Sequence, residues 1–297
     1  MKARFLCGCI VSLMLAASCE TVIDVEIPDR PPALVVNSYL STDSSVVSVD
    51  LTETAAILSE GAFDKVTGAT ISLAENGQAI GEFSEVSPGF YISNVTPVPG
   101  RTYELTVSKD VYETVTASNV IPEEQIMVSA GMPERVVREG FEQIRLRITI
   151  SDPPGIKNYY EIGFFRYFET FDPETGEINE SDSVASFSYI ELDGAQFENS
   201  PEKFGNTILI DDALFDGNEE NIDVLYDSFF DFNGGEDEAV FYYTVRNTSQ
   251  AYYDYERNKR IHFYNSDDPF AEPIPVVGNV ENGYGVFAGY QSFISEI

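Results

Sequence analysis

The sequence predicts a mainly β protein: an N-terminal immunoglobulin-like or transthyretin-like antiparallel sandwich, followed by a second antiparallel β domain with one short helix. Three observations support this prediction. Short segments that alternate apolar and polar residues recur along most of the chain, and they are rich in β-branched residues. Turn pairs such as Asn76-Gly77 and Pro99-Gly100 separate them. A helical period is found in one segment only, near residues 247–263.

The N-terminal sandwich is expected between residues 33 and 121. Its six or seven short strands are predicted in residues 33–40, 44–52, 69–83, 89–93, 101–108 and 112–118. Residues 69–83 are typical of a hairpin about Asn76-Gly77, because both turn positions favour a positive φ angle.

A change in residue composition and pattern predicts a domain boundary. Prolines, glutamates and a glycine interrupt any period between residues 122 and 139, so we expect a linker there that proteases reach. The full prediction is a signal peptide at 1–18, a tether at 19–32, a β-sandwich domain at 33–121, a linker at 122–139 and a second β domain at 140–297.

The second domain is expected to contain longer strands. Residues 141–152 alternate cleanly, which predicts one buried and one solvated face. Residues 158–171 are aromatic on both faces, which predicts a central strand. Further strands are predicted in residues 183–192, 206–212, 222–230 and 238–247.

The predicted helix covers residues 247–263. Thr248 or Ser249 is expected to cap its amino end. The residues that define its apolar spacing and its basic carboxyl-terminal cluster are Ala251, Tyr252 and Tyr255, and then Arg257, Lys259 and Arg260.

The first 18 residues have the parts of a bacterial export signal. Lys2 and Arg4 precede an apolar run, and small residues follow it. The run is about ten residues long, whereas a bilayer-spanning helix needs about 20. A cleaved signal is therefore favoured over a transmembrane anchor.

Cys19 directly follows the small residues Ala16, Ala17 and Ser18, as in a lipobox. We expect Cys19 to carry the lipid that anchors the chain to the outer membrane, facing either the periplasm or the cell surface. The alternative is ordinary secretory cleavage at the same small residues. Because the other two cysteines lie in the leader, the mature chain has no disulfide and no thiolate metal site.

The charge of the chain is strongly negative. Its formal net charge is −33, and removing Lys2 and Arg4 with the leader leaves 15 basic and 50 acidic residues, a charge of −35. This balance argues against nucleic acid and against adhesion to anionic lipid. Solubility is the simpler interpretation, and cation binding is the more specific one.

The residue inventory leaves few catalytic options. His262 is the single histidine, so a histidine zinc site is excluded, and a packing or capping role is expected for it. Carboxylate pairs are abundant, but no glycosidase motif accompanies them, and the chain has no tryptophan for sugar stacking. We therefore assign no catalytic residues and no cofactor.

One acidic stretch, residues 211–227, is the candidate for calcium binding. Its acidic residues surround Gly217, but Leu214 occupies the middle ligand position of an EF-hand loop. An acidic loop is the favoured interpretation, calcium stays open, and no metal site is assigned. The acidic residues concerned are Asp211, Asp212, Asp216, Glu219, Glu220 and Asp223.

Four segments are particular: "CETVIDVEIP", "SDPPGIKNYYEI", "SQAYYDYERNKR" and "DPFAEPIPVVGNVENGYGVFAGYQS". With them the chain resembles a family of Bacteroidetes outer-membrane lipoproteins labelled domain of unknown function four-two-four-nine. The resemblance runs from Cys19 nearly to the end of the chain and is most specific at its two ends, and Asn282-Gly283 stands where relatives usually show a double glycine.

The resemblance implies an accessory or substrate-capture partner of a TonB-dependent transporter, without catalytic residues to carry over. Tyr252, Tyr255 and Arg257 are the candidate partner-binding residues, because tyrosine and arginine are frequent interface anchors. The alternatives are a carboxylate-dependent glycoside hydrolase and a free-standing surface adhesin.

Overall fold

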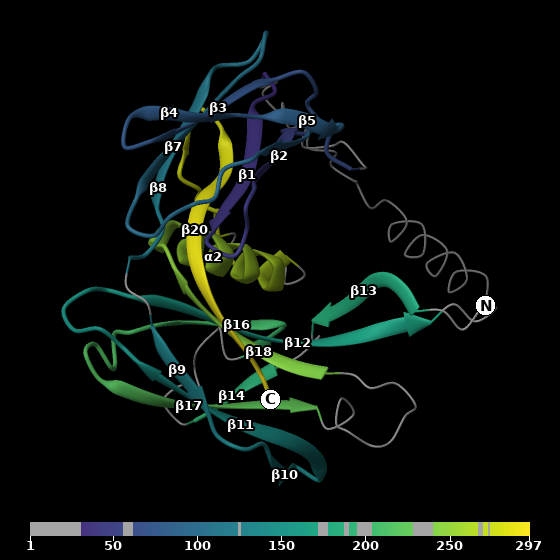
Figure 1. The fold of residues 1–297 in the computed structure, drawn as a ribbon, viewed down its shortest axis with the longest axis vertical. Coiled ribbons are helices and arrows are strands. Elements are labelled where there is room, and N and C mark those ends of the chain that lie inside the picture. The colour runs from purple at the N-terminus through teal and green to yellow at the C-terminus, as the bar shows by residue number, and fades with distance from the viewer. Residues whose placement is uncertain are drawn as a thin grey trace, which may run out of the picture. The chain divides into compact units, whose positions relative to one another are not determined.

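The structure is a computed structural model that describes residues 31–55, 62–123, 126–171, 178–186, 190–194, 204–227, 240–266, 270–272 and 274–297. The predicted signal peptide and Cys19 lie outside the described residues. Within the described part, the chain forms three β-sheets and one helix (Figure 1). The mainly β fold class predicted from the sequence is confirmed.

The nine-stranded sheet, here called the shared sheet, has the order β13-β12-β18-β20-β1-β2-β6-β5, and β16 also pairs with β12. Its strands are β1 (Leu34–Ser41), β2 (Val47–Glu53), β5 (Ser84–Ser87), β6 (Phe90–Ser93), β12 (Tyr159–Phe171), β13 (Ile178–Ser186), β16 (Thr207–Asp211), β18 (Val240–Thr248) and β20 (Tyr284–Glu296).

Two smaller sheets pack against it. The N-terminal sheet, in the order β19-β8-β7-β3-β4, contains β3 (Thr70–Glu75), β4 (Gln78–Glu82), β7 (Thr102–Ser108), β8 (Val115–Val120) and β19 (Val280–Glu281). The C-terminal sheet, in the order β10-β11-β17-β14-β15 with β9 on β11, contains β9 (Met127–Ala130), β10 (Glu134–Arg138), β11 (Phe141–Ser151), β14 (Ile190–Asp193), β15 (Phe204–Gly205) and β17 (Glu219–Asp227).

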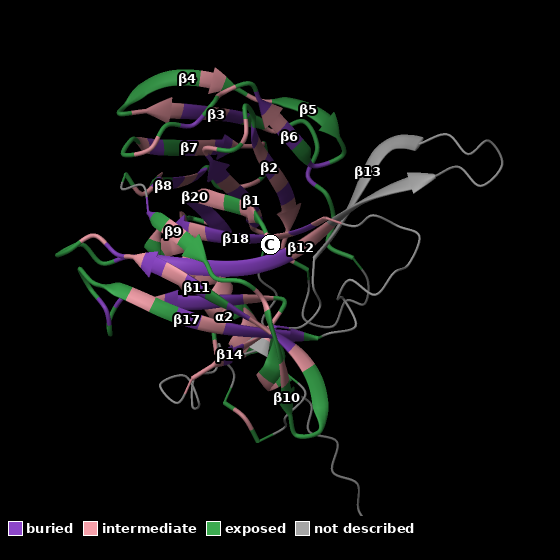
Figure 2. Ribbon diagram, turned by 60° about the horizontal axis from the view of Figure 1, so that its bottom comes forward, coloured by how far each residue is buried: buried purple, intermediate pink, exposed green. Residues whose placement is uncertain are grey.

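Two hydrophobic cores lie between facing sheets, because alternate residues of each strand point toward the facing sheet. One core lies between the N-terminal sheet and strands β1, β2, β6 and β20. The other lies between the C-terminal sheet and strands β12, β16 and β18. A third, smaller cluster includes Tyr252 of helix α2 (Gln250–Ser266) and Val286 and Ala288 of β20. The edge strands β4 and β5 are largely exposed, as their green colour in Figure 2 shows.

Strand β20 belongs to both halves of the molecule. Its first part pairs in parallel with β1, from Tyr284 to Tyr290, and its last part pairs antiparallel with β18, from Tyr290 to Glu296. Phe287 is buried in the N-terminal core, while Phe293 packs against the C-terminal core. In Figure 1 this strand, drawn in yellow, runs the length of the shared sheet.

This arrangement bears on the predicted domain organisation. The segment predicted as a linker, residues 122–139, contains β9 and β10, both paired with β11. Residues 32–297 form one compact unit, in which β20 pairs with β1 of the first predicted domain and with β18 of the second. The predicted domain bounds stay a prediction. Whether proteases reach the segment stays a prediction.

The hairpin predicted at Asn76-Gly77 is confirmed. Asn76 and Gly77 have φ angles of 49° and 79°, and they connect β3 to β4 as a tight hairpin. Gly285, with φ of 101°, has a different reason: a Cβ there would lie 2.0 Å from the carbonyl oxygen of Val36. Only glycine permits this close approach of β20 to β1.

Helix α2 (Gln250–Ser266) confirms the predicted helix and its cap. The Ser249 hydroxyl accepts a hydrogen bond from the Tyr252 amide at 3.3 Å, and the Ser249 carbonyl accepts one from Tyr253. The helix continues to Ser266, so the predicted placement of basic residues in its last turn is wrong. Instead, Lys259 and Arg260 lie in its middle and help to line a pocket.

Candidate functional site

The candidate site lies on the face of the shared sheet that turns toward α2. Because side chains alternate along a strand, one face collects Glu161, Gly163 and Phe165 from β12, while the next residues point into the C-terminal core. The same rule places Thr244 and Arg246 of β18 on this face, beside Tyr290 and Ser292 of β20. These residues enclose a cavity of about 690 Å³, here called the sheet pocket.

Other elements close the sides of the sheet pocket. The end of β1 and the following turn contribute Ser41 and Asp43, and α2 contributes Glu256, Lys259 and Arg260. The size falls in the range of pockets that hold small ligands, about 300 to 1,000 Å³.

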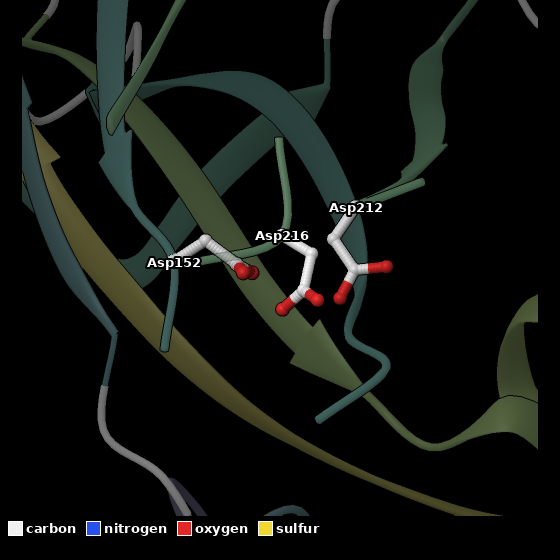
Figure 3. A group of neighbouring side chains, drawn as sticks. All are labelled: Asp152, Asp212 and Asp216. Atoms are coloured by element: carbon white, nitrogen blue, oxygen red, sulfur yellow. The ribbon is translucent and has the colours of Figure 1, made fainter. Parts of the chain in front are cut away.

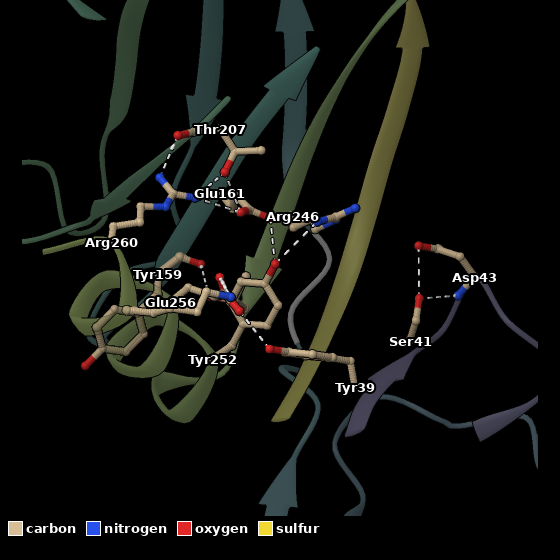
Figure 4. A network of polar contacts seen from close by, with 12 residues as sticks. Tyr39, Ser41, Asp43, Tyr159, Glu161, Thr207, Arg246, Tyr252, Glu256 and Arg260 are labelled. Atoms are coloured by element: carbon tan, nitrogen blue, oxygen red, sulfur yellow. Dashed lines mark hydrogen bonds and ion pairs between the residues drawn. The ribbon is translucent and has the colours of Figure 1, made fainter. Parts of the chain in front are cut away.

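Glu161 is the centre of the polar network (Figure 4). It is only 4% exposed, and both carboxylate oxygens are engaged. Arg246 Nη1 and the Tyr252 hydroxyl each donate to Oε2 at 2.7 Å. Thr207 donates to Oε1 at 2.7 Å, and Arg260 Nη2 donates to the same oxygen at 3.2 Å. Since β12 and β18 place Glu161 directly opposite Arg246, sheet register builds the pair.

Arg246 is held from two sides. Its guanidinium carbon lies 4.8 Å from the centre of the Tyr290 ring, a cation–π contact. Burial, the largest single cause, lowers the pKa of Arg246, but Glu161, Tyr252 and Tyr290 together outweigh it, so the pKa of Arg246 lies above its ordinary value. The described hydrogen bonds of this side chain are donated by Nη1. Among the described residues, Nε has no hydrogen-bond partner.

Two tyrosines of the network stay protonated. Burial, reinforced by the Glu161 charge, raises the pKa of Tyr252, and burial with Glu256 nearby raises that of Tyr39. Tyr39 accordingly donates to Glu256 Oε1 at 2.7 Å. Both tyrosines therefore act as hydrogen-bond donors at all physiological pH values.

One end of this sheet face is apolar. Phe165 and Tyr242 are opposite each other in neighbouring strands, and their rings stack with centres 5.3 Å apart and an interplanar angle of 12°. Ile294, which also lines the sheet pocket, is 52% exposed. The pocket thus joins a charged centre to a flat apolar rim.

The two glutamates of the sheet pocket are held by hydrogen-bond donors. Glu161 accepts from Tyr252, and Glu256 accepts from Tyr39 and pairs with Lys259. The single histidine, His262, is exposed on α2, and its Nδ1 lies 2.9 Å from the carbonyl oxygen of Ile274. No nucleophile among the described lining residues is paired with an imidazole.

The residues predicted from sequence have different positions. Cys19 lies outside the described residues. Tyr252 is 5% exposed and belongs to the Glu161 network. Tyr255 is half-buried, and its hydroxyl donates to Asn37 at 3.1 Å. Arg257 is half-buried on α2. Their role in partner binding stays a prediction.

Sequence reasoning missed Glu161 and Arg246. A signal was available, because Glu161 lies between Tyr160 and Ile162, and Arg246 follows Val245 in a strand rich in aromatic residues. Charged residues inside a buried strand require a partner. Sequence alone did not reveal that β12 and β18 are neighbours in the shared sheet.

A second polar group, here called the aspartate cluster, lies where two loops of the C-terminal half meet. It consists of Asp152, Asp212 and Asp216 (Figure 3), whose carboxylate oxygens lie within 4.8 Å of one another. Asp152 and Asp212 are buried, and Asp216 is exposed. Two of the three belong to the stretch considered for calcium, while Asp152 was not foreseen.

Backbone amides hold these carboxylates. Gly217 donates to Asp152 at 2.8 Å, Asn158 to Asp212 at 2.6 Å, and Gly155 to Asp216 at 2.7 Å. The Tyr160 hydroxyl also donates to Asp152. The cluster therefore ties residues 152–158 to residues 212–217.

The aspartate cluster is electrostatically unfavourable. Within the part of the chain that the structure describes, no basic side chain forms an ion pair with it, and the nearby Lys157 pairs with Asp211 instead, at 3.5 Å. Burial raises the pKa of Asp212, and the charges of Asp152 and Asp216 raise it further. These facts are consistent with the predicted acidic loop and leave the calcium question open.

Comparison with known proteins identifies a family. The family model described as Domain of unknown function (DUF4249) matches residues 20–294. No curated protein matches the chain. Within the described residues, no helix has both the length and the apolar character needed to cross a membrane.

The similar solved structures are distant. One is a proposed carbohydrate binding protein from Bacteroides uniformis, 11% identical over 90% of this chain and 100% of its own, with a TM-score of 0.21. Another is a structure of manganese lipoxygenase of Gaeumannomyces graminis with part of zonadhesin of Komagataella pastoris, 11% identical over 75% and 91%, with a TM-score of 0.17. Likeness at this level carries no inference about fold or ligand.

Proposed function

Since the chain belongs to the family described as Domain of unknown function (DUF4249), we propose that it is a non-enzymatic, lipid-anchored outer-membrane protein. In this proposal it acts as an accessory of a TonB-dependent transporter and helps to capture the transporter's substrate. Cys19 carries the anchor, and the folded body carries the binding site.

The observation that supports capture is the sheet pocket. It combines a cavity of ligand size with fixed hydrogen-bond donors around Glu161 and a flat apolar rim at Phe165. Pockets of this kind bind small molecules through apolar walls and a few convergent polar groups. Among the described lining residues both glutamates are held by donors and no hydroxyl is paired with an imidazole, which supports retention over turnover.

The anchor is supported by the leader and its single following cysteine. We expect Cys19→Ala to release the protein from the membrane fraction, because the acyl chains supply the membrane affinity. Cys9→Ala is the matched control, since Cys9 lies inside the predicted signal and is removed with it. Sedimentation of the Cys19→Ala protein with outer membranes, as for the parent chain, would contradict the anchor.

The partnership is tested by purifying the tagged chain from native membranes in mild detergent. We expect a TonB-dependent transporter to co-purify, and deletion of the protein to reduce uptake of that transporter's substrate. Recovery of no transporter, with uptake unchanged, would contradict the accessory role and favour a free-standing adhesin. Release of sugars from a glycan panel would instead favour the glycoside hydrolase alternative.

A further inference from the structure

We infer that the sheet pocket takes a ligand that carries a carboxylate on a flat, apolar body such as an aromatic ring. This inference deepens the proposed capture function and depends on the pocket being a binding site. It adds the chemical class of the ligand.

The first argument is local charge. The chain as a whole has a net charge of −33, yet two guanidinium groups, those of Arg246 and Arg260, surround the single Glu161 carboxylate. Lys259 and Glu256 neutralise each other at 2.6 Å. The lining residues of the sheet pocket as a whole are neutral, three basic against three acidic, but the positive charge is concentrated around Glu161, and the remaining acid, Asp43, lies exposed at the side. An anion of matching size compensates such a charge.

The second argument is the donor capacity left over after the internal pairs are made. Arg246 uses Nη1 for Glu161 and Tyr252, and its side chain is still 32% exposed. A guanidinium presents five N–H groups in a planar fork that matches a carboxylate. Since Nη1 is engaged and Nε is buried, Nη2 is the part of the fork left for a ligand, and the contact with Tyr290 fixes its plane before a ligand arrives.

The third argument is a buried hydroxyl without a partner. Thr244 is only 8% exposed and lines the sheet pocket next to Arg246 on the same strand face, but its Oγ1 makes no hydrogen bond. A buried polar atom without a partner costs free energy. This oxygen is closed to solvent, so a carboxylate that reaches it from the pocket would accept the Thr244 proton without displacing water and would remove this cost.

The apolar part of the ligand is argued from the rim. The stacked pair of Phe165 and Tyr242 and the exposed Ile294 lie along the same face as Thr244 and Arg246. Aromatic faces of this kind favour a planar apolar group that packs against them. A ligand with its carboxylate at Arg246 would direct its body to this rim.

One lining residue opposes the ligand, and it supplies a sensitive test. Asp43 is exposed at the side of the sheet pocket, where its carboxylate accepts a hydrogen bond from Ser41 at 3.1 Å. Its negative charge repels an incoming carboxylate but has no effect on a neutral ligand. Asp43→Asn should therefore tighten carboxylate binding selectively.

The experiment uses the full chain in mild detergent and two probes observed by fluorine NMR, 4-fluorobenzoate and the neutral 4-fluorobenzamide. Micelles without protein give the blank for each probe. We expect the benzoate to bind at least about tenfold more tightly than the benzamide, since charge-assisted hydrogen bonds to arginine exceed neutral ones by about 1.4 kcal/mol or more.

Four variants locate the binding. Arg246→Lys keeps the charge but loses the fork, and should weaken benzoate binding severalfold. Thr244→Val should weaken it while the protein becomes no less stable. Asp43→Asn should strengthen it about two- to fivefold. Lys65→Gln, which breaks only the exposed pair with Asp50 outside the pocket, should leave it unchanged.

Equal binding of both probes, or benzoate binding that ignores Asp43→Asn and Thr244→Val, would overturn the carboxylate assignment. Absence of benzoate binding would overturn it as well. The transporter pull-down is independent of these probes, so a transporter that co-purifies while benzoate fails to bind contradicts the ligand class and leaves the accessory role standing. Should benzoate bind as expected with no transporter recovered, the ligand class stands and the accessory role fails.

Discussion

The sheet pocket and the aspartate cluster both bury carboxylates in the same half of the molecule, but they stabilise them in opposite ways. Glu161 is surrounded by two arginines and two hydroxyl donors. Asp152 and Asp212 receive backbone amides and one tyrosine hydroxyl, without a basic partner among the described side chains.

The difference shows what each site can attract. Side-chain cations around Glu161 exceed its charge and leave donors facing a cavity, so this site favours an anion. Burial raises the pKa of Asp212, and because backbone amides carry no net charge, repulsion from the neighbouring aspartates raises it further. The aspartate cluster therefore favours a proton or a cation.

The largest effect is expected when Glu161 is changed. Glu161→Gln leaves the guanidiniums of Arg246 and Arg260 buried without their counterion, which should destabilise the protein by about 3 to 5 kcal/mol. Chemical denaturation measures the loss. The control is Glu104→Gln, on an exposed strand position, which should change the free energy of unfolding by less than about 0.5 kcal/mol. A loss as small as that of the control would mean that the network is not a stabilising centre.

A smaller loss is expected for Tyr252→Phe. This change removes the hydroxyl that donates to Glu161 but keeps the ring that packs edge-on against Tyr39 and Tyr290. A hydrogen bond to a charged group is worth about 1.5 to 3 kcal/mol. Tyr284→Phe, at an exposed position, is the control and should be neutral. Equal behaviour of the two variants in denaturation would contradict the role of the Tyr252 hydroxyl.

In the aspartate cluster, removing a charge is expected to leave the protein as stable or to stabilise it. Asp212→Asn removes a repelled charge yet keeps an oxygen for the Asn158 amide, so at pH 7 the variant should be at least as stable as the parent. Because the pKa of Asp212 is raised in the folded state, the cost of its charge is present at high pH and disappears as pH falls through that raised value. The advantage of the variant should shrink accordingly in unfolding curves recorded from pH 7 down to about pH 4.

Adding calcium to the same stability measurements tests whether the aspartate cluster binds a metal ion. If millimolar calcium stabilises the parent and Asp212→Asn abolishes that gain, the aspartate cluster is a metal site and not only a brace between loops. A destabilised Asp212→Asn protein in the absence of calcium would contradict the account of repulsion.

The smallest effect is expected at the partly exposed pair of Arg147 and Asp223, in which an arginine, as at Glu161, holds an aspartate. Arg147 holds Asp223 through two hydrogen bonds, of 2.6 and 2.7 Å, and these bonds lower the pKa of Asp223. Asp223→Asn should cost about 0.2 to 1 kcal/mol at pH 7. Since the folded pKa is depressed, this contribution is present above the unfolded value near 3.9 and is lost as pH falls through the folded value. A cost that persists at pH 2 would contradict this assignment.

Much of the fold could be predicted from the sequence, because local signals were strong where one face of a strand is solvated. The hairpin at Asn76-Gly77, the alternating strand β11 and the Ser249-capped helix are examples. Strand β20 was missed, because it is buried on both faces through its first half and glycine interrupts its apolar run. Its parallel partner β1 lies more than 240 residues away along the chain, a distance that local patterns do not encode.

The site was less predictable than the fold. The sequence predicts Tyr252 and Tyr255 of the helix as partner anchors, but the Tyr252 hydroxyl donates to Glu161 inside the protein. Glu161 and Arg246 gain their meaning from a register between two strands about 85 residues apart. Asp152 meets Asp212 and Asp216 only after the sheets have formed. In each case the chemistry follows from long-range pairing and not from local spacing.

The most direct test of the central claim is a crystal structure of the full chain with 4-bromobenzoate, using the anomalous signal of bromine to locate the ligand. The account predicts the carboxylate within hydrogen-bonding distance of Arg246 and Thr244, and the bromine next to the stacked rings of Phe165 and Tyr242. A bromine signal outside the sheet pocket, or a pocket that holds no ligand at a concentration saturating in solution, would contradict it.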